Sequence, residues 1–301
     1  MQHKSGFVSL AGRPNVGKST LMNQIIGEKI AIVSNRPQTT RNKIRSIFTE
    51  TDCQIIFIDT PGLHEPKTKL GDFMVKSAQN SFVGVDIVLY LVEPTVKIHE
   101  FDLQMLEKLG KFTDADTKTM LIINKVDKIS KPDILLIIEA YSKYNFSEIV
   151  PISAIKGENT DKMLAAIKSH LPLGPQYFPD DTITDQPERQ IAAELIREKA
   201  LLYLQEEIPH GIAVEIEKFK KRKKSELVDI GAVVYCERES HKPIVIGKAG
   251  VMLKKIGQAA RADIERLLGS PINLQLWVKV RKNWRDNDLI LRGLGYDARE
   301  L

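Results

Sequence analysis

Gly12-Arg13-Pro14-Asn15-Val16-Gly17-Lys18-Ser19 is the stretch that decides the fold of this chain. It matches G-x-x-x-x-G-K-[ST], the phosphate-binding loop. The apolar run 7–11 before it predicts a buried strand, and residues 20–26 after it have the apolar spacing of a helix. At such a junction, backbone N–H groups and the helix dipole attract phosphate. Lys18 is expected to contact the β- and γ-phosphates and Ser19 to bind Mg²⁺, with Thr20 beside them.

A polar loop follows the first predicted helix. Residues 34–41 have no hydrophobic period and include the pair Thr39-Thr40. Because this loop comes directly after a phosphate-binding loop and its helix, one of its hydroxyl groups is expected to complete the Mg²⁺ shell. Thr40 is the preferred candidate and Thr39 the alternative.

A second motif, Asp59-Thr60-Pro61-Gly62-Leu63, ends the apolar strand predicted at 53–58. An Asp at the carboxyl end of a buried strand beside a phosphate loop is suited to hold a Mg²⁺-bound water. The Gly62 N–H is expected to contact the γ-phosphate. The predicted metal ligands are therefore Ser19, Thr40 and Asp59, and the predicted catalytic residues are Lys18, Thr40 and Gly62.

A third motif selects the base. Asn124-Lys125-Val126-Asp127 follows the apolar strand 120–123. The Asp127 carboxylate is expected to accept hydrogen bonds from N1–H and the exocyclic amine of guanine, whereas adenine would leave buried acceptors facing each other. Ser153-Ala154-Ile155 follows another strand, and the Ala154 N–H is expected to donate to the guanine oxygen.

Together, these motifs resemble the GTP-binding domain of the translation-factor-like GTPases over residues 7–172. The resemblance implies an α/β P-loop domain with a doubly wound, mostly parallel sheet, which the alternation of strand and helix patterns also predicts. In Ras-like proteins a Gln orients the attacking water at the position of Leu63, so slow intrinsic turnover is expected here. Asn15 matches the residue that helps to hold K⁺ in related potassium-activated GTPases. Its alternative role is to stabilise the loop.

A Pro-rich segment, 173–186, predicts a linker between a GTP-binding domain at 1–172 and a second domain at 187–301. The second domain begins with a helix at 187–207, followed by strands at 213–219 and 228–237. A G-x-x-G loop at 247–250, a helix at 251–268 and a strand at 272–280 complete it. This order resembles a type-2 KH domain, an α+β fold that binds single-stranded RNA. The predicted RNA-binding residues are Ile246, Gly247, Lys248, Ala249, Gly250, Val251, Lys254 and Lys255.

Two features of the second domain allow alternative interpretations, and a third concerns its tail. The basic run Lys220–Lys224 is either a phosphate contact or a solvated hairpin tip. Trp277 and Trp284 are candidates for base stacking, although the neighbours of Trp277 favour a place in the core. The tail 286–301 is expected to form a short helix and a loose end.

Charge and cysteine content limit the functional class. Residues 1–185 contain 22 basic and 22 acidic residues, whereas residues 186–301 contain 22 and 17, so the net charge of +5 lies in the second domain. This excess suits a polyanionic partner, either nucleic acid or an acidic membrane surface, and it equally suits a basic domain that is merely soluble. Cys53 and Cys236 have no metal-ligand spacing and predict buried thiols in a reducing compartment. No apolar run reaches the roughly 20 residues of a membrane span, so a cytoplasmic protein is expected.

The pairing of both domains is similar to a family of bacterial GTPases that assist ribosome assembly. The resemblance implies slow hydrolysis of GTP to GDP, a Mg²⁺ cofactor, and binding to the 3′ end of 16S ribosomal RNA in the small (30S) subunit. It also implies peripheral association with the inner membrane. A monomer is expected.

Overall fold

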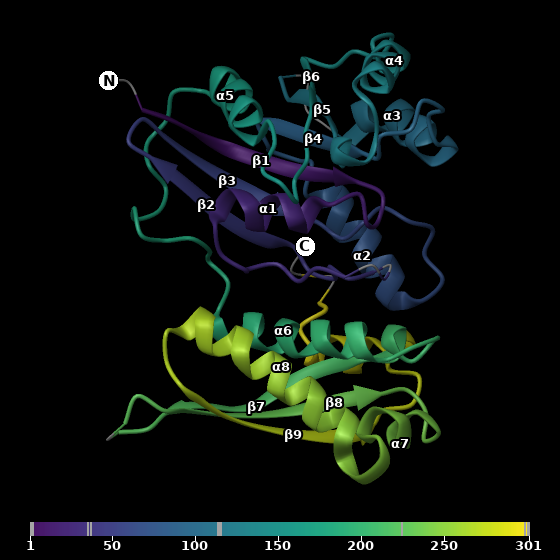
Figure 1. Ribbon diagram of the computed structural model, residues 1–301, viewed down its shortest axis with the longest axis vertical. Helices are drawn as coiled ribbons and strands as arrows, with labels where there is room; N and C mark the ends of the chain where they lie inside the picture. The colour runs from purple at the N-terminus through teal and green to yellow at the C-terminus, as the bar shows by residue number, and fades with distance from the viewer. Residues whose placement is uncertain are drawn as a thin grey trace.

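The computed structural model describes residues 3–34, 36, 38–112, 116–223, 225–297 and 299. The predicted loop residues Asn35 and Pro37, the hairpin residue Lys224 and tail residues 298, 300 and 301 lie outside this description. Two domains lie one above the other, joined by a single extended segment (Figure 1). Within the described ranges, no helix has the length and hydropathy needed to span a membrane.

The first domain is built on a six-stranded sheet with the order β2-β3-β1-β4-β5-β6. Neighbouring strands are parallel except β2, which is antiparallel to β3. The first strand β1 lies between β3 and β4, so the chain changes direction across the sheet there. Loops at the carboxyl ends of β1, β3 and β5 therefore open into one crevice. The strands are β1 (Lys4–Gly12), β2 (Ile44–Glu50), β3 (Cys53–Asp59), β4 (Ile87–Val92), β5 (Lys118–Ile123) and β6 (Glu148–Pro151).

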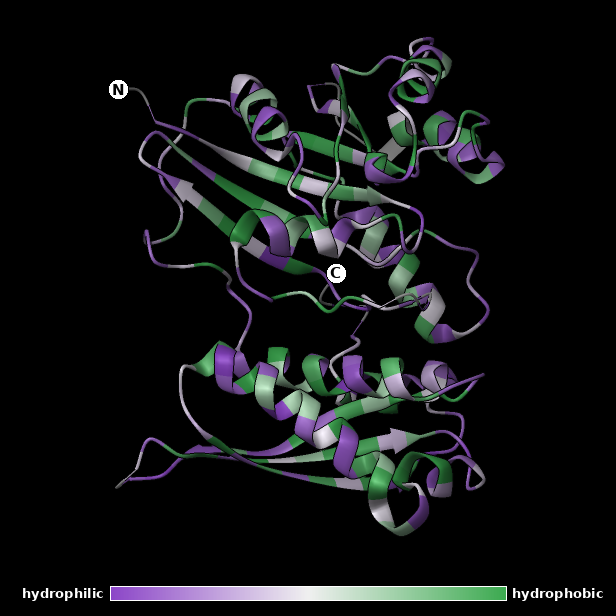
Figure 2. Cartoon of the chain, in the orientation of Figure 1, coloured by the Kyte–Doolittle hydropathy of each residue, from purple (hydrophilic) through white to green (hydrophobic). Residues whose placement is uncertain are grey.

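Helices cover both faces of this sheet. Its inner strands are largely hydrophobic, whereas the edge strand β2 and the helices also carry hydrophilic residues (Figure 2). Alternate strand residues serve opposite faces: Leu89 packs with helices α1 and α5, and Tyr90 packs with α2, α3 and α4. This confirms the predicted doubly wound α/β fold. The helices are α1 (Lys18–Ile26), α2 (Lys69–Asn80), α3 (Glu100–Phe112), α4 (Lys131–Tyr141) and α5 (Thr160–His170).

The second domain has three strands with helices on one face. Strand β7 is antiparallel to β8, and β8 is parallel to β9. The predicted KH order lacked one helix, α7, which lies directly before the G-x-x-G loop. Pro243 in its first turn is compatible with a helix, because the N–H groups there have no partner within the helix. The elements are α6 (Glu188–Tyr203), β7 (Ala213–Lys221), β8 (Val228–Cys236), α7 (His241–Ile246), α8 (Val251–Leu268), β9 (Ile272–Val280) and α9 (Asp288–Gly293). Short 3₁₀ helices are η1 (Val126–Lys128), η2 (Pro209–Gly211), η3 (Lys248–Gly250) and η4 (Trp284–Asp286).

The connecting segment lies against the first domain. Ser5 Oγ donates to the Pro175 carbonyl at 2.7 Å, and Gln54 accepts from the N–H groups of Tyr177 and Phe178. Further along the segment, the Ile183 carbonyl accepts a hydrogen bond from the Ile47 N–H at 2.9 Å. These contacts attach the segment along the edge of the sheet before α6 begins.

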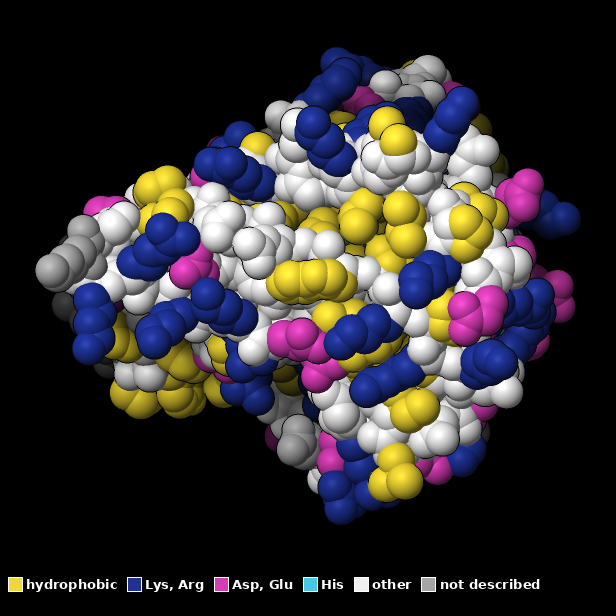
Figure 3. All heavy atoms as spheres, turned by 90° about the horizontal axis from the view of Figure 1, so that it is seen from below, with side chains coloured by type: hydrophobic (Ala, Val, Ile, Leu, Met, Phe, Trp, Pro, Cys, Tyr) yellow, Lys and Arg dark blue, Asp and Glu magenta, His cyan; other side chains and the backbone are white. Residues whose placement is uncertain are grey.

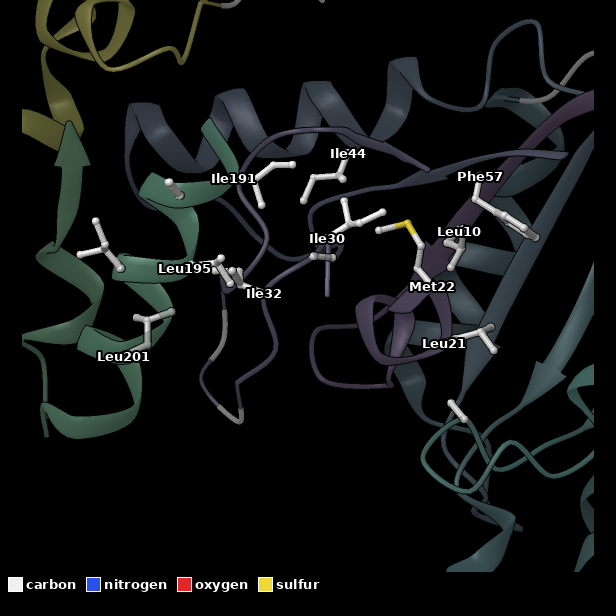
Figure 4. Packing of buried hydrophobic residues seen from close by; sticks show 14 of the residues in the cluster. Leu10, Leu21, Met22, Ile30, Ile32, Ile44, Phe57, Ile191, Leu195 and Leu201 are labelled. Atoms are coloured by element: carbon white, nitrogen blue, oxygen red, sulfur yellow. The ribbon is translucent and has the colours of Figure 1, made fainter. Parts of the chain in front are cut away.

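A continuous hydrophobic cluster crosses from one domain to the other. Ile30 and Ile32, in the loop between α1 and β2, are buried between the first sheet and α6. Figure 4 shows Ile32 beside Leu195, and Ile44 beside Ile191. The loop that follows the phosphate-binding helix is thus part of the interdomain core.

The C-terminal segment also packs between the domains. Tyr296 is buried, and its ring lies 5.8 Å from the ring of Phe73 on α2. Leu291 belongs to the same cluster. The predicted short helix of the tail is present as α9, but the prediction of a loose end is wrong as far as Tyr296, because Tyr296 buries its ring against the first domain.

Candidate functional site

The phosphate-binding loop has the backbone that its glycines permit. Gly12 has φ +137° and Gly17 has φ +105°. A Cβ atom at Gly12 would lie 2.4 Å from the Leu91 carbonyl oxygen, and one at Gly17 would lie 2.2 Å from Asn124 Nδ2. Helix α1 begins at Lys18 with no side-chain cap. Its first N–H groups therefore lack intrahelical partners, which is the arrangement that attracts phosphate.

Lys18 is buried in this loop. Its Nζ donates to the carbonyl oxygens of Gly12 and Arg13, each at 3.1 Å. Burial lowers the pKa of Lys18 to about 8, although the charge of Asp59 opposes this shift. The ammonium group is thus held beside the loop in surroundings where an anion would stabilise its charge strongly.

Three oxygen-bearing side chains meet beside Lys18. Ser19 Oγ donates to Asp59 Oδ2 at 2.5 Å and lies 3.1 Å from Thr40 Oγ1. Asp59 Oδ1 is buried and has no hydrogen-bond partner among the residues described, and burial raises the pKa of this carboxyl. By contrast, Thr39 Oγ1 donates to the Arg36 carbonyl at 2.6 Å. Hard oxygen donors around an unpaired carboxylate oxygen fit Mg²⁺. Of the two threonines, Thr40 is the one with its hydroxyl in this cluster.

The base-selecting motif is tied to the phosphate loop. Asn124 Nδ2 donates to the Val16 carbonyl at 2.7 Å, and Lys125 Nζ donates to the Asn15 carbonyl at 2.7 Å. Asp127 Oδ1 accepts from Ser153 Oγ at 2.6 Å, which lowers the pKa of Asp127 and keeps it ionised. These bonds hold the carboxylate at one end of the crevice and the phosphate loop at the other.

A cavity of about 250 Å³ joins the two ends. Its lining residues come from all the predicted motifs and from the loop between α1 and β2. They are Pro14, Asn15, Gly17, Lys18, Ser19, Thr20, Ile32, Val33, Ser34, Gln38, Thr39, Thr40, Gly62, Asn124, Lys125, Asp127, Lys128, Ala154 and Ile155.

The side chains of several predicted nucleotide-binding residues do not enter the cavity and instead contact other parts of the first domain. Arg13 Nε donates to Asp102 on α3 at 3.0 Å, so its side chain is directed away. Thr60 Oγ1 donates to the Leu10 carbonyl, and Val126 is buried. Leu63 is only 4% exposed and packs on the opposite face of the sheet.

The Ala154 N–H already has a hydrogen-bond partner within the protein. It donates to Asn124 Oδ1 at 3.0 Å, so a guanine oxygen would have to share it.

A second candidate site lies along the G-x-x-G loop. Gly247, Ala249 and Gly250 all have positive φ. Beside them a groove of about 400 Å³ is lined by Gly250, Leu253, Lys254, Gly257, Gln258, Arg261, Asn273, Leu274 and Leu276. Lys254 lies on this groove, and Val251 is 65% exposed next to the loop. The Nζ of Lys255 lies instead 4.3 Å from the ring centroid of Tyr203 on α6.

The groove runs about two helical turns beyond Lys254 along α8. Lys254, Gly257 and Arg261 follow Gly250 at intervals of three or four residues, so the three share one face of α8. This spacing is a sequence signal that would have extended the site to Arg261.

The two tryptophans have the opposite of their expected environments. Trp277 is 46% exposed, whereas Trp284 is fully buried and donates from Nε1 to the Gly211 carbonyl at 2.9 Å. Trp277 lies on the face of β9 away from the helices, and Trp284 supports the interdomain core. The core assignment of Trp277 is wrong, and Trp284 is not accessible for stacking.

Much of the basic hairpin is paired internally. Arg222 forms an ion pair with Asp229 at 2.8 Å, and Lys221 forms one with Glu226 at 2.5 Å. Part of the positive charge of the hairpin is therefore compensated within the second domain.

Contacts that the sequence motifs did not reveal join the nucleotide-site loop to α6. Arg197 is buried and donates from Nη2 to the Thr39 carbonyl. The neighbouring Glu198 accepts from the Val33 N–H at 2.8 Å and from Lys29 Nζ at 2.5 Å. Nothing in the local sequence distinguishes these charges from those on any amphipathic helix, because their partners lie about 160 residues away.

Comparison with known proteins agrees with both halves of the structure. Residues 7–125 match a family model described as a 50S ribosome-binding GTPase, and residues 207–285 match a KH domain model. The GTPase Era of Clostridioides difficile (strain 630) is 56% identical over 98% of this chain and 99% of its own length. The GTPase Era of Alkaliphilus metalliredigens (strain QYMF) is 54% identical over 99% and 100%.

Two solved structures are similar to nearly the whole chain. One is an Aquifex aeolicus Era variant bound to GDP·AlF4⁻, and the other is Era in complex with MgGDPNP and nucleotides 1506–1542 of 16S ribosomal RNA. Each has a TM-score of 0.93 and 40% identity, and covers 98% of this chain and 99% of the matched chain.

Proposed function

This chain belongs to the Era family of GTPases, and we propose from this premise that it uses GTP to control its binding to 16S ribosomal RNA near the 3′ end, in support of small-subunit (30S) assembly. The GTP-binding domain would comprise residues 1–172, and the KH domain residues 187–301, with 173–186 between them. The observation that carries this proposal is the attachment of the nucleotide-site loop to α6 of the KH domain.

The phosphate end of the cavity is suited to hold the γ-phosphate. Backbone N–H groups of the loop and the ammonium group of Lys18 supply positive charge where the terminal phosphate would lie. Ser19, Thr40 and Asp59 would hold Mg²⁺, which neutralises phosphate charge when it is bound. Gly62 lines the cavity, and a Cβ atom there would lie 2.8 Å from Pro14 Cα, so the close approach of the two loops requires glycine.

Hydrolysis would depend on positioning and charge and not on a side-chain base. Leu63 is apolar and packed away from the cavity, so it cannot orient water. We propose that K⁺ held with the help of Asn15 supplies positive charge near the phosphates, as in related GTPases. Turnover in KCl should exceed turnover in NaCl at equal ionic strength, and Asn15→Ala should remove the difference. Equal rates in both salts would reject this role for K⁺.

The base end is suited to guanine. Asp127 stays ionised and offers carboxylate oxygen to the two guanine donors, while the aliphatic stem of Lys125 lies beside the cavity. Ser153, through its bond to Asp127, fixes the orientation of the carboxylate. A base that offers an acceptor at N1 would face this carboxylate unfavourably.

Nucleotide state would reach the KH domain through residues 29–41. Thr40 would be drawn to the metal by a γ-phosphate, and the adjacent Thr39 carbonyl is bound by Arg197. Arg41 extends the attachment by donating to the carbonyls of Ile212 at 2.7 Å and His210 at 3.0 Å. A ligand that orders this loop would therefore bias the interdomain arrangement, and RNA would bias nucleotide affinity reciprocally.

The direct test measures RNA affinity of the full chain with a non-hydrolysable GTP analogue and with GDP. We expect tighter binding of the 1506–1542 RNA segment in the GTP-analogue state. Lys248→Glu should weaken both states by reversing a charge in the loop. It is a cleaner variant than Gly247→Asp, because a Cβ atom at Gly247 would lie 2.7 Å from the backbone nitrogen of Met252. Identical affinities in the two nucleotide states would defeat the coupling.

Membrane contact is a separate part of the proposal. The positive net charge of +5 supports peripheral association with an anionic bilayer. Co-sedimentation with vesicles of anionic lipid, but not with neutral vesicles, is the expected result. A monomer in gel filtration with light scattering is expected in solution, and absence of vesicle binding at low salt would remove the membrane role.

A further inference from the structure

The KH sheet has an outer face that is only partly covered. Along each strand, every second side chain points to this outer face, and the others point to the helices. At one end of the outer face, Val233 and Tyr235 are buried in a cluster with Trp284 and Tyr296. At the other end, Gly231 on β8 and Gln275 on β9 are directly paired, and no described segment packs over them in the hydrophobic clusters. The sheet therefore presents an open surface beyond the C-terminal segment.

Trp277 lies on this open surface. Its Cζ3 atom would be 3.2 Å from a Cβ atom at Gly231, so the absent side chain allows the ring to lie close against the neighbouring strand. The residue is nevertheless 46% exposed. One part of the ring is thus supported by backbone, and another part is available to a ligand. A supported, exposed aromatic ring is the usual platform for stacking an unpaired base.

Polar groups suited to a nucleic acid surround the ring. A hollow of about 220 Å³ next to it is lined by Lys218, Arg222, Asp229, Ile230, Gly231, Asn273 and Gln275. Arg222, Asn273 and Lys218 donate hydrogen bonds to Asp229 and lower its pKa, and the two cations among them compensate its charge. Lys220 lies opposite Asp229 in the strand register, and Lys279 forms an ion pair with Glu217 at 2.9 Å. Among these residues the cations outnumber the carboxylates. Figure 3, which views the molecule from below Figure 1, shows hydrophobic groups among Lys and Arg, with fewer Asp and Glu.

The open face is continuous with the G-x-x-G groove. Asn273 lines both the groove and the outer hollow, and β9 is the edge strand of the sheet. A KH groove holds about four nucleotides, whereas the relative's RNA runs from 1506 to 1542. An RNA strand that leaves the groove across β9 would meet Trp277 directly.

From this arrangement we propose that the outer face of β8 and β9 is a second RNA-binding surface, on which Trp277 stacks with an unpaired base outside the G-x-x-G groove. This inference rests on RNA binding by the KH domain. Trp277 and Gln275 would take part in RNA binding there, although neither residue lines the groove.

The test compares two RNAs on the full chain. One is the 1506–1542 segment of 16S ribosomal RNA, and the other is a fragment of about five nucleotides that only fills the groove. Trp277→Ala should weaken binding of the long RNA by about 5- to 150-fold, the range for loss of one stacked base. It should leave the short RNA and basal GTP hydrolysis unchanged. Trp277→Phe should retain most affinity, and Leu202→Ala, which removes another exposed apolar residue, should have no effect.

Fluorescence supplies a second readout, because Trp277 is the exposed member of the two tryptophans. The long RNA should protect it from acrylamide quenching, and Trp277→Phe should abolish the protected signal. Unchanged long-RNA affinity in Trp277→Ala would overturn the second surface, as would an equal loss for both RNAs. A variant that binds RNA normally but fails to bind the small subunit would assign the face to a protein partner. If neither RNA binds the unaltered chain, the proposed function itself fails.

Discussion

Replacing Arg197 with Met should uncouple RNA affinity from nucleotide state. The Arg197 side chain is fully buried, donates to the Thr39 carbonyl and forms an ion pair with Glu194 at 2.5 Å. Met preserves the unbranched stem but cannot donate. A hydrogen bond from a charged group contributes about 1.5–3 kcal/mol, which is similar to the usual coupling energy of about 1–3 kcal/mol between two sites.

Because the two energies are similar, loss of this one hydrogen bond should remove most of the coupling. If the bond transmits the coupling, the ratio of RNA affinities in the GTP-analogue and GDP states should fall by about 5- to 150-fold, towards one. Binding of the nucleotide itself should change less, because Arg197 does not line the cavity. Fluorescence anisotropy with labelled RNA, at saturating GTP analogue and at saturating GDP, measures the ratio.

Two controls separate coupling from instability. Removing one member of a buried ion pair costs about 3–5 kcal/mol of stability, but the Glu194 side chain is 22% exposed and can be hydrated. Glu194→Gln with Arg197→Met removes the unpaired charge altogether. Arg189→Met, on the same helix, loses a bond to the Ile216 carbonyl within the KH domain and should keep the ratio. A folded Arg197→Met protein with an unchanged ratio would refute the reasoning.

Four further predictions follow from single contacts. Burial lowers the pKa of His210, and the nearby Arg41, Arg285 and Arg36 lower it further against the opposing charge of Glu207. The unfolded chain therefore binds the proton more readily, so stability should fall as pH drops below about 6.5. In urea unfolding from pH 8 to 5, the free energy of unfolding should depend less on pH in His210→Gln than in the unaltered chain. Asp127→Ala removes the acceptor of two charged hydrogen bonds and should weaken GTP by at least about 100-fold in calorimetry, with no gain for ATP. Trp284→Phe loses the bond to Gly211 and should cost about 1–3 kcal/mol in urea unfolding, whereas Trp277→Phe should cost little. Leu63→Gln should not accelerate hydrolysis, since the side chain at this position is packed away from the cavity, and should lower stability by about 1–3 kcal/mol; a faster rate in a phosphate-release assay would contradict this geometry.

The features that could be predicted from sequence depend on short-range patterns. The phosphate-binding loop requires Gly12 and Gly17 at fixed positions, because their φ values exclude other residues. Helix α8 and strand β9 occupy the predicted residues, since apolar periods of 3.6 and 2 persist through both. Cys53 and Cys236 are free and buried, which confirms the prediction of buried thiols.

The errors come from contacts between distant segments. Trp277 has apolar neighbours along β9, but strand alternation places it on the face opposite to the helices. The tail around Tyr296 lacks a long hydrophobic pattern, yet Phe73 lies ready to pack against it from the first domain. A single sequence does not indicate which of two faces will be covered, because the covering segment is distant along the chain.

The adjacency of Thr39 and Thr40 explains how a small change at the nucleotide can reach the KH domain. The side chain of Thr40 and the backbone carbonyl of Thr39 contact different domains. The Thr40 hydroxyl lies 3.1 Å from Ser19 Oγ in the phosphate site, while the preceding carbonyl accepts from Arg197 on α6. Val33 repeats this arrangement, since it lines the cavity and its N–H donates to Glu198. One loop is therefore a wall of the nucleotide cavity and a surface of the interdomain core at once. Coupling across it needs no long chain of intermediate residues, because the same backbone segment makes both sets of contacts.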